Sequence, residues 1–123
     1  MNEQNFIKWL DEPEEHDYPA AISYLSLIFP RKTAKELAAE LKRADAIEFE
    51  AKDIFRASGL SLLGVSNSHV EKDRIKILSG ESLSPILLVR QSELGKVIIA
   101  DGYHRLCAVY SMDEDASIPC RII

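Results

Sequence analysis

Four consecutive apolar residues that follow Pro85, residues 86–89, constrain the fold more than any other stretch of the chain. A strand with one solvated face alternates apolar and polar residues, so this unbroken run predicts a strand buried on both faces. A second apolar run, residues 97–100, returns after a polar connection that contains Gly95. The two runs therefore predict a β-hairpin.

The residues Asp-Gly-Tyr-His-Arg at 101–105 come directly after this second run and open a helix predicted over residues 103–112. The start of a helix has unpaired backbone N–H groups and a partial positive charge. Gly102 lets a ligand approach the backbone closely, Arg105 offers a planar fork suited to phosphate, and His104 adds a donor. The junction is therefore a candidate phosphate site.

Asp101 has three alternative roles at this junction. Beside phosphates it would bind a cation or act as a base, and as an ordinary residue before a helix it would be the N-cap. The whole stretch also has a simpler interpretation, a capped helix start whose side chains are solvated or packed. Spacing alone does not choose between these interpretations.

A further helix is predicted over residues 68–80, with Ser68 as its cap and Ser68-His69-Val70-Glu71 as a capping box. The apolar spacing predicts an inner side formed by Val70, Arg74, Ile77 and Leu78. The opposite side is predicted to be polar, with His69, Lys72, Asp73 and Lys76. A strand beginning at residue 46, a short helix over 53–58 and a last strand over 118–122 complete this part of the chain.

The first 45 residues are predicted to be helical. Asp17 and Pro19 favour a helix start ahead of an apolar stripe over residues 20–29, which Pro30 ends. A capping box at Thr33 predicts the start of a second amphipathic helix. We therefore expect residues 1–45 to form an N-terminal helical extension, a hairpin packed on a domain formed by residues 46–123.

Composition limits the classes of function. The chain has 123 residues and a net charge of −5, which argues against broad nucleic-acid binding. No apolar run approaches the roughly 20 residues of a membrane span, and the acidic start lacks the layout of a signal peptide, so a cytoplasmic protein is expected. Cys107 and Cys120 are expected to be free core thiols. The three histidines are not paired at metal-ligand spacing, so no metal site is predicted.

Residues 84–123, SPILLVRQSELGKVIIADGYHRLCAVYSMDEDASIPCRII, resemble the ParB/sulfiredoxin-like superfamily, also described as the ParB-like nuclease domain. The likeness lies in the order of a proline-led strand, a hairpin, a strand, a glycine-led basic motif that opens a helix, and a strand beginning at Ile-Pro. It extends back to about Ile47 and leaves out residues 1–45. It implies an α+β fold, a small mixed sheet with packed helices, here preceded by the N-terminal helical hairpin.

The resemblance places Tyr103 where sulfiredoxins have their nucleophilic cysteine, in Gly-Gly-Cys-His-Arg. A phenol does not perform thiolate chemistry, so sulfiredoxin activity is not expected. The free-serine kinases of the superfamily carry Asp-Gly-His-Thr-Arg, which Asp101, Gly102 and Arg105 match. Their carboxylate base would correspond to Glu48 or Glu50, although both are equally typical of solvent-facing strand residues.

These branches share a nucleotide phosphate held at the helix start. The resemblance therefore implies that the chain binds a nucleotide or another phosphorylated small molecule, with ATP, ADP or CTP and Mg²⁺ as candidate cofactors. It implies phosphotransfer or nucleotide hydrolysis by Asp101 and His104. The binding residues it implies are Gly102, Tyr103, His104 and Arg105, with His69 and Lys72 from the preceding helix.

Two other classes of function stay open at this point. A non-enzymatic interaction module would keep a vestigial phosphate site and use residues 17–44 to form a homodimer or bind a protein partner. A nuclease, as the superfamily's older label suggests, is the weakest alternative, because the acidic balance is unsuited to nucleic acid. The residues alone do not decide whether the protein is an enzyme.

Overall fold

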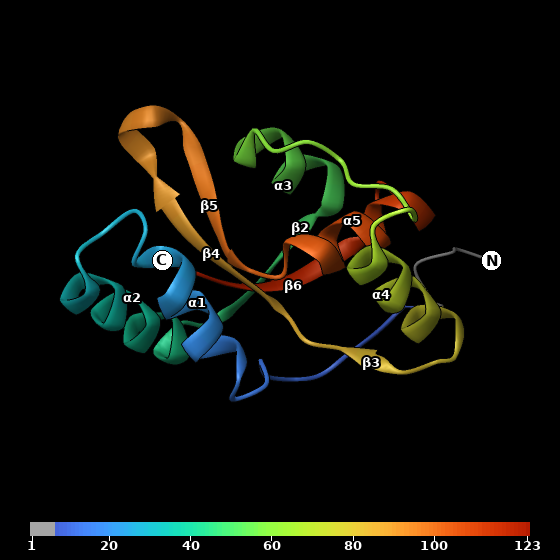
Figure 1. Ribbon diagram of the computed structural model, residues 1–123, viewed down its shortest axis with the longest axis horizontal. Helices are drawn as coiled ribbons and strands as arrows, with labels where there is room; N and C mark the ends of the chain where they lie inside the picture. The colour runs from blue at the N-terminus through green and yellow to red at the C-terminus, as the bar shows by residue number, and fades with distance from the viewer. Residues whose placement is uncertain (1–6) are drawn as a thin grey trace.

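The computed structural model describes residues 7–123, and its central sheet has four strands in the order β2-β6-β4-β5. These strands are β2 (Ala46–Glu50), β4 (Ile86–Gln91), β5 (Lys96–Asp101) and β6 (Ser117–Ile122). β4 pairs antiparallel with β5 and parallel with β6, and β2 pairs antiparallel with β6. The sheet is thus mixed, and the expected α+β class is confirmed (Figure 1).

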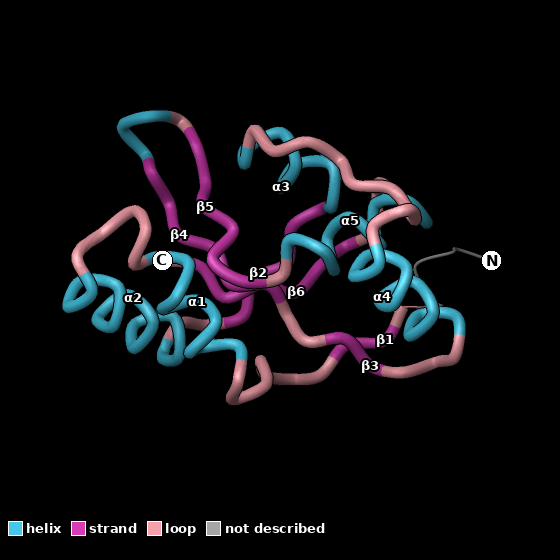
Figure 2. The backbone as a smooth tube through the Cα atoms, in the orientation of Figure 1, coloured by secondary structure: helices cyan, strands magenta, loops and turns pink. Residues whose placement is uncertain are grey.

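Helices cover both faces of this sheet. On one face lie α1 (Asp17–Leu25) and α2 (Arg31–Arg43), and on the other lie α3 (Ala51–Ser58), α4 (Ser68–Leu78) and α5 (Tyr103–Met112), as Figures 1 and 2 show. Helix α1 packs against α2, and α4 packs against α5. Within residues 7–123, no helix combines the length and apolar character that crossing a membrane requires.

The apolar run of β4 serves two separate hydrophobic cores. Ile86 and Leu88 are buried against α3, α4 and α5, whereas Leu87 and Val89 are buried against α1 and α2. All four side chains are at most 4% exposed. The prediction of a strand buried on both faces is therefore confirmed, and alternation along the strand sends each neighbour to a different core.

The N-terminal helices pack on the sheet through Leu25 and Leu41, both fully buried. Their bounds differ from those predicted. α1 begins at Asp17 and ends at Leu25, and residues 26–29 form turns. α2 begins at Arg31 rather than at a Thr33 cap, because Pro30 occupies the N-cap with its fixed φ and no side chain caps the helix.

A short strand lies within the stretch that was predicted to be helical. β1 (Lys8–Trp9) pairs in parallel with β3 (Ser82–Leu83), forming a two-stranded sheet. Two residues are too few to show a period, so the sequence pattern carried no signal for it. The first six residues of the predicted extension lie outside the described residues.

The observed helix α4 differs from the predicted helix in two respects. Its N-cap is Asn67, not Ser68, and the Asn67 side chain accepts hydrogen bonds from the backbone N–H groups of His69, at 2.9 Å, and Val70, at 3.2 Å. Val70 and Ile77 are buried as predicted, whereas Leu78 is 65% exposed. Successive residues are turned by about 100° around a helix, so Leu78 lies off the stripe that Ile77 buries.

Candidate functional site

The junction between β5 and α5 is built around Gly102. Gly102 is the N-cap of α5 and has φ 109°, in the left-handed region that favours glycine. A Cβ placed there would lie 2.9 Å from Cγ1 of Ile86 and 3.0 Å from Nη2 of Arg105. Asp101 is the last residue of β5 and makes no capping hydrogen bond to α5, so its predicted alternative role as the N-cap is wrong.

A polar cleft of about 180 Å³ lies in front of this junction. The packing of α4 against α5 turns the polar side of α4 towards the start of α5. The structure therefore brings all the predicted site residues to one place. The cleft is lined by His69, Lys72, Asp73 and Lys76 of α4 and by Asp101, Gly102, Tyr103, His104 and Arg105.

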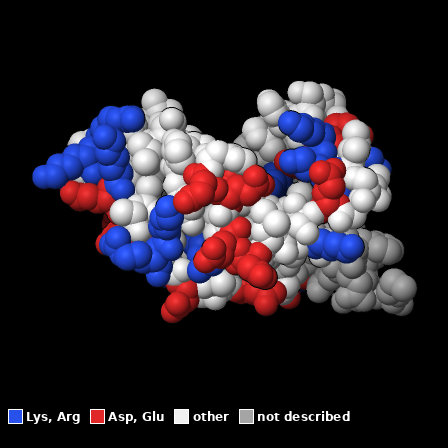
Figure 3. Space-filling view, turned by 90° about the horizontal axis from the view of Figure 1, so that it is seen from below, with Lys and Arg blue, Asp and Glu red and all other residues white. Residues whose placement is uncertain are grey.

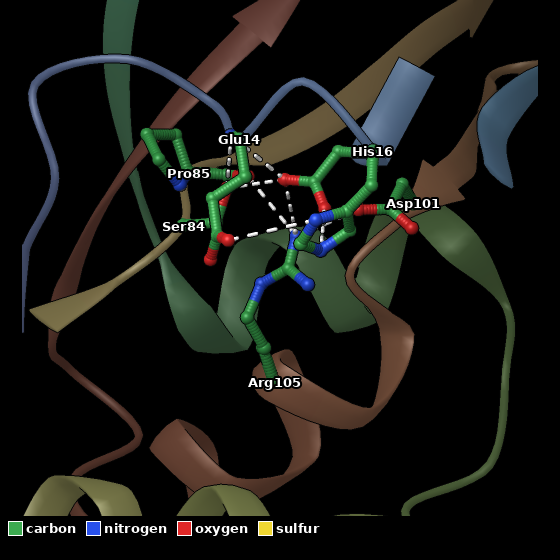
Figure 4. Close-up of polar contacts among 7 residues, drawn as sticks. Glu14, His16, Ser84, Pro85, Asp101 and Arg105 are labelled. Atoms are coloured by element: carbon green, nitrogen blue, oxygen red, sulfur yellow. Dashed lines mark hydrogen bonds and ion pairs between the residues drawn. The ribbon is translucent and has the colours of Figure 1, made fainter. Parts of the chain in front are cut away.

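The Arg105 guanidinium is held on its inner side. Its Nη2 donates to Oδ2 of Asp101, at 2.9 Å, and to the carbonyl of Pro85, at 3.1 Å. Figure 4 shows the side chain reaching from α5 towards Ser84, Pro85 and Asp101. Nε is buried and has no hydrogen-bond partner within residues 7–123. Arg105 therefore fixes the junction and offers only part of its guanidinium to the cleft.

Asp17 is a second anion beside Arg105, and the sequence pattern predicts for it only a position at the start of a helix. Its Oδ2 lies 3.9 Å from Nη2 of Arg105, accepts from the backbone N–H of Glu14 at 3.2 Å, and accepts a short hydrogen bond from Ser84 Oγ. Asp17 is only 2% exposed. Because Ser84 and Arg105 lie far along the chain from Asp17, no local pattern could have identified these contacts.

His104 lines the cleft beside His69, and the two ring centroids are 4.9 Å apart. Burial lowers the pKa of His104, and the neighbouring His69 lowers it further. The opposing effect of the Asp73 carboxylate is smaller. In the protein without a ligand, this environment favours the neutral imidazole, which can accept a proton when an anion arrives.

The phenol of Tyr103 holds a neighbouring loop in place. Its hydroxyl donates a short hydrogen bond to the carbonyl of Ser61, in the segment between α3 and α4. Burial raises the pKa of Tyr103, so the neutral donor form is favoured. The ring centroid of Tyr103 lies 5.6 Å from that of His104. Tyr103 thus contributes an oriented ring to the site.

Asp73 is a cleft residue that sequence reasoning placed on the polar side of its helix but did not select. Burial raises the pKa of this carboxyl, and the nearby cations oppose that rise, Arg105 most strongly and then Lys76. Burial also raises the pKa of Asp101, again against Arg105. The cleft therefore combines cationic groups with two carboxyl groups in a partly desolvated space.

The predicted base candidates lie elsewhere. Glu48 and Glu50 belong to β2, which is separated from β5 by β6 and β4, and neither lines the cleft. Glu50 instead lies 3.4 Å from Nζ of Lys52. The interpretation of these residues as ordinary strand residues is the one that fits their positions.

Cys107 and Cys120 are both free and buried, as predicted. Cys107 lies one turn into α5, and its Sγ accepts a hydrogen bond from the backbone N–H of Leu63 at 3.5 Å. Burial raises the pKa of both thiols, that of Cys120 to about 12. Neither thiol is therefore suited to act as a nucleophile.

Charge is distributed unevenly over the surface. In the view of Figure 3, Lys and Arg form a large group at the left end and smaller groups at the right, and most Asp and Glu lie between them. Within the described part of the chain, no group of three or more His, Cys, Asp or Glu side chains is arranged to hold a metal ion.

Comparisons of the chain with models of protein families, with curated proteins and with solved structures found no match.

Proposed function

We propose that the polar cleft binds the phosphate of a nucleotide or another phosphorylated small molecule. The observation that carries this proposal is the meeting of two groups of donors in one cleft. Lys72, Lys76 and His69 approach from α4, while His104 and the first N–H groups of α5 approach from the junction. A helix start with basic side chains opposite it is the arrangement that phosphate anions favour.

We also propose a ParB/sulfiredoxin-like fold for residues 46–123. The order β4, β5, α5 and β6 follows the order of elements on which that resemblance rests, with Gly102 at the β5–α5 junction. The β4–β6 pairing is parallel and the β4–β5 pairing is antiparallel, as suits a small mixed sheet. The two free thiols support our placing the protein in the cytoplasm.

For a phosphotransfer or hydrolysis step, His104 is the residue best placed to move a proton. Asp101, the other predicted catalytic residue, is bonded to Arg105 and would first have to leave that pair. With ATP, ADP or CTP as ligand, Asp73 would hold Mg²⁺, and Asp101 would join it only after leaving Arg105. This cation prefers one or two carboxylates together with phosphate oxygens.

Calorimetric titration with inorganic phosphate, ADP, ATP and CTP, with and without Mg²⁺, tests this proposal. We expect saturable binding that Lys72→Ala weakens by about tenfold, because a charge-assisted hydrogen bond is lost. Lys35→Ala, which removes an exposed lysine from α2, is the matched control and should leave binding unchanged. Absence of binding by every one of these anions would refute the proposal.

A second candidate function is a protein-interaction module that uses α1 and α2. The apolar side of this hairpin is covered by the sheet, but the turn between its helices leaves Leu27 83% exposed and Ile28 43% exposed. Light scattering of the wild-type protein and of Leu27→Ser tests this function. A dimer that the substitution dissociates would favour it, and a monomer that binds phosphate would favour the first proposal.

A further inference from the structure

A second cleft, of about 360 Å³, adjoins the polar one. It lies between α1, Leu60 and the outer side of β5, and its walls are mainly apolar side chains. Asp101, Gly102, Tyr103 and His104 line both clefts. The junction therefore borders both a polar space and an apolar one.

The walls of this apolar cleft come from widely separated parts of the chain. Ile99 and Ala100 of β5 are 5% and 4% exposed and form its base. Ala20 and Tyr24 of α1 form one side, so the N-terminal hairpin helps to build the cleft. Tyr24 is 42% exposed and Leu60 is 41% exposed, which leaves two large apolar groups facing solvent beside the junction.

From these clefts we infer that the ligand is a phosphate ester whose body is an aromatic ring system. Its phosphate lies in the polar cleft and its ring in the cleft between α1 and β5. This inference rests on the proposed phosphate site and adds to it the class of the organic group.

The size and the lining residues of the apolar cleft favour an aromatic organic group in the ligand. An apolar cavity of about 150 Å³ already holds a benzene molecule, so a cleft of about 360 Å³ has room for a ring. Tyr24 and Tyr103 offer ring faces and edges, with which an aromatic group makes favourable offset or edge contacts. The hydrogen bond from Tyr103 to Ser61 holds one of these rings in place before binding.

The edge position of β5 adds a means of orienting the ring system. β5 pairs only with β4 in the described residues, so the backbone groups on its outer side have no partner strand. These N–H and C=O groups lie along the strand that forms the base of the cleft. Polar atoms on the edge of an aromatic ligand can pair with them.

Phenyl phosphate and inorganic phosphate are the matched probes for this inference, and both are titrated into the full chain. We expect phenyl phosphate to bind at least about tenfold more tightly, because burial of the ring adds to the phosphate contacts. Ala20→Trp, at an exposed position of α1, fills the apolar cleft and should abolish this advantage while leaving inorganic phosphate binding unchanged. Ser23→Trp, also exposed on α1 but outside the cleft, is the control and should retain it.

The outcomes separate this inference from the proposed function. Equal affinities of the wild-type protein for the two probes, or an undiminished advantage in Ala20→Trp, would overturn the aromatic body and leave the phosphate site intact. Binding of neither probe would overturn the phosphate site itself, and with it the inference. A tenfold advantage that only Ala20→Trp removes would support both.

Discussion

Oδ2 of Asp17 lies 3.9 Å from Nη2 of Arg105, which brings the start of the first helix to the start of the last. Ser84 joins the pair by donating its hydroxyl proton to the same Asp17 oxygen. Both are largely removed from solvent, since 3% of the Asp17 side chain and 16% of the Arg105 side chain are exposed. The N-terminal hairpin is therefore connected to the candidate site by buried charge, as well as by apolar packing.

Asp17→Ala should destabilise the protein by about 2 to 3 kcal/mol. It leaves the Ser84 hydroxyl without its acceptor and takes one of two carboxylates away from the buried Arg105 guanidinium. Urea denaturation followed by circular dichroism measures the change in the free energy of unfolding. Glu15→Ala is the control, since the Glu15–Lys42 ion pair is exposed and should contribute little. Equal stabilities of the two variants would contradict the assigned role of Asp17.

Gly102→Ala should cost roughly 1 to 3 kcal/mol of stability. The positive φ is strained for alanine, and the new methyl group would press on Ile86 and on Arg105. Thermal unfolding of the variant gives the measurement. Gly64→Ala is the matched control, because Gly64 does not have a positive φ and no atom lies within 4 Å of its added Cβ. If the Gly102→Ala and Gly64→Ala proteins had the same melting temperature, the junction would be shown to tolerate a side chain at residue 102.

Tyr103→Phe should loosen the segment between α3 and α4 while preserving the ring. The variant loses the hydrogen bond to the Ser61 carbonyl, which is worth about 1 kcal/mol. We expect amide hydrogen exchange to accelerate over residues 60–63 and to stay unchanged in β4. Unchanged exchange in residues 60–63 would show that other contacts hold this segment.

The charge of His104 should make both stability and anion binding depend on pH. Burial lowers the pKa of His104 in the folded protein from its ordinary value of 6.5. The neutral imidazole therefore makes its full contribution to the free energy of unfolding above pH 6.5. This contribution is lost as the pH falls through the lower pKa of the folded state. Below pH 6.5, the free energy of unfolding should therefore fall more steeply in the wild-type protein than in His104→Gln.

Sulfate is the anion that isolates the effect of His104 on binding, since sulfate keeps its double negative charge between pH 7.5 and pH 5.5. An anion in the cleft favours the imidazolium, so sulfate affinity should rise as the pH falls from 7.5 to 5.5 and should rise less in His104→Gln. Calorimetric titration at both pH values gives the comparison. The same slope in both proteins would exclude His104 from the anion site.

Both thiols should resist modification in the native protein. The pKa of Cys120 is raised to about 12 and that of Cys107 is also raised, so almost no thiolate is present at pH 8. Reaction with an aromatic disulfide reagent should be slow in buffer and should become fast, at two thiols per chain, in 6 M guanidinium chloride. Rapid reaction of one thiol in buffer would show that its burial is transient.

Much of the candidate site could be predicted from local patterns. The spacing of His69, Lys72 and Lys76 puts them on one side of a helix, and the residues 101–105 place a glycine and a histidine at a helix start. Each pattern needs only a helical period or a strand–helix junction, which a single sequence displays. That the two patterns face each other was expected from a resemblance, and the packing of α4 on α5 puts them in one cleft.

The parts that could not be predicted depend on tertiary contacts. Arg105 is turned inward by Asp101, four residues earlier, and also by the carbonyl of Pro85 and the nearby Asp17. The last two contacts are not visible in the local sequence. The capping box at Ser68 was a valid local pattern, but Asn67, one residue earlier, offers an equally good acceptor and takes the cap. Local rules name the candidates for such positions, and packing selects among them.

Because β4 contributes side chains to two hydrophobic cores, the way in which the protein unfolds is constrained. If α1 and α2 lifted away, Leu87 and Val89 would meet water while Ile86 and Leu88 stayed covered. The exposed half of the strand would then give up its share of hydrophobic free energy, and with it part of the base on which the ligand clefts rest. The hairpin and the sheet should consequently melt in one cooperative transition. A ligand bound at the junction should therefore also raise the melting temperature of α2, which lines neither cleft.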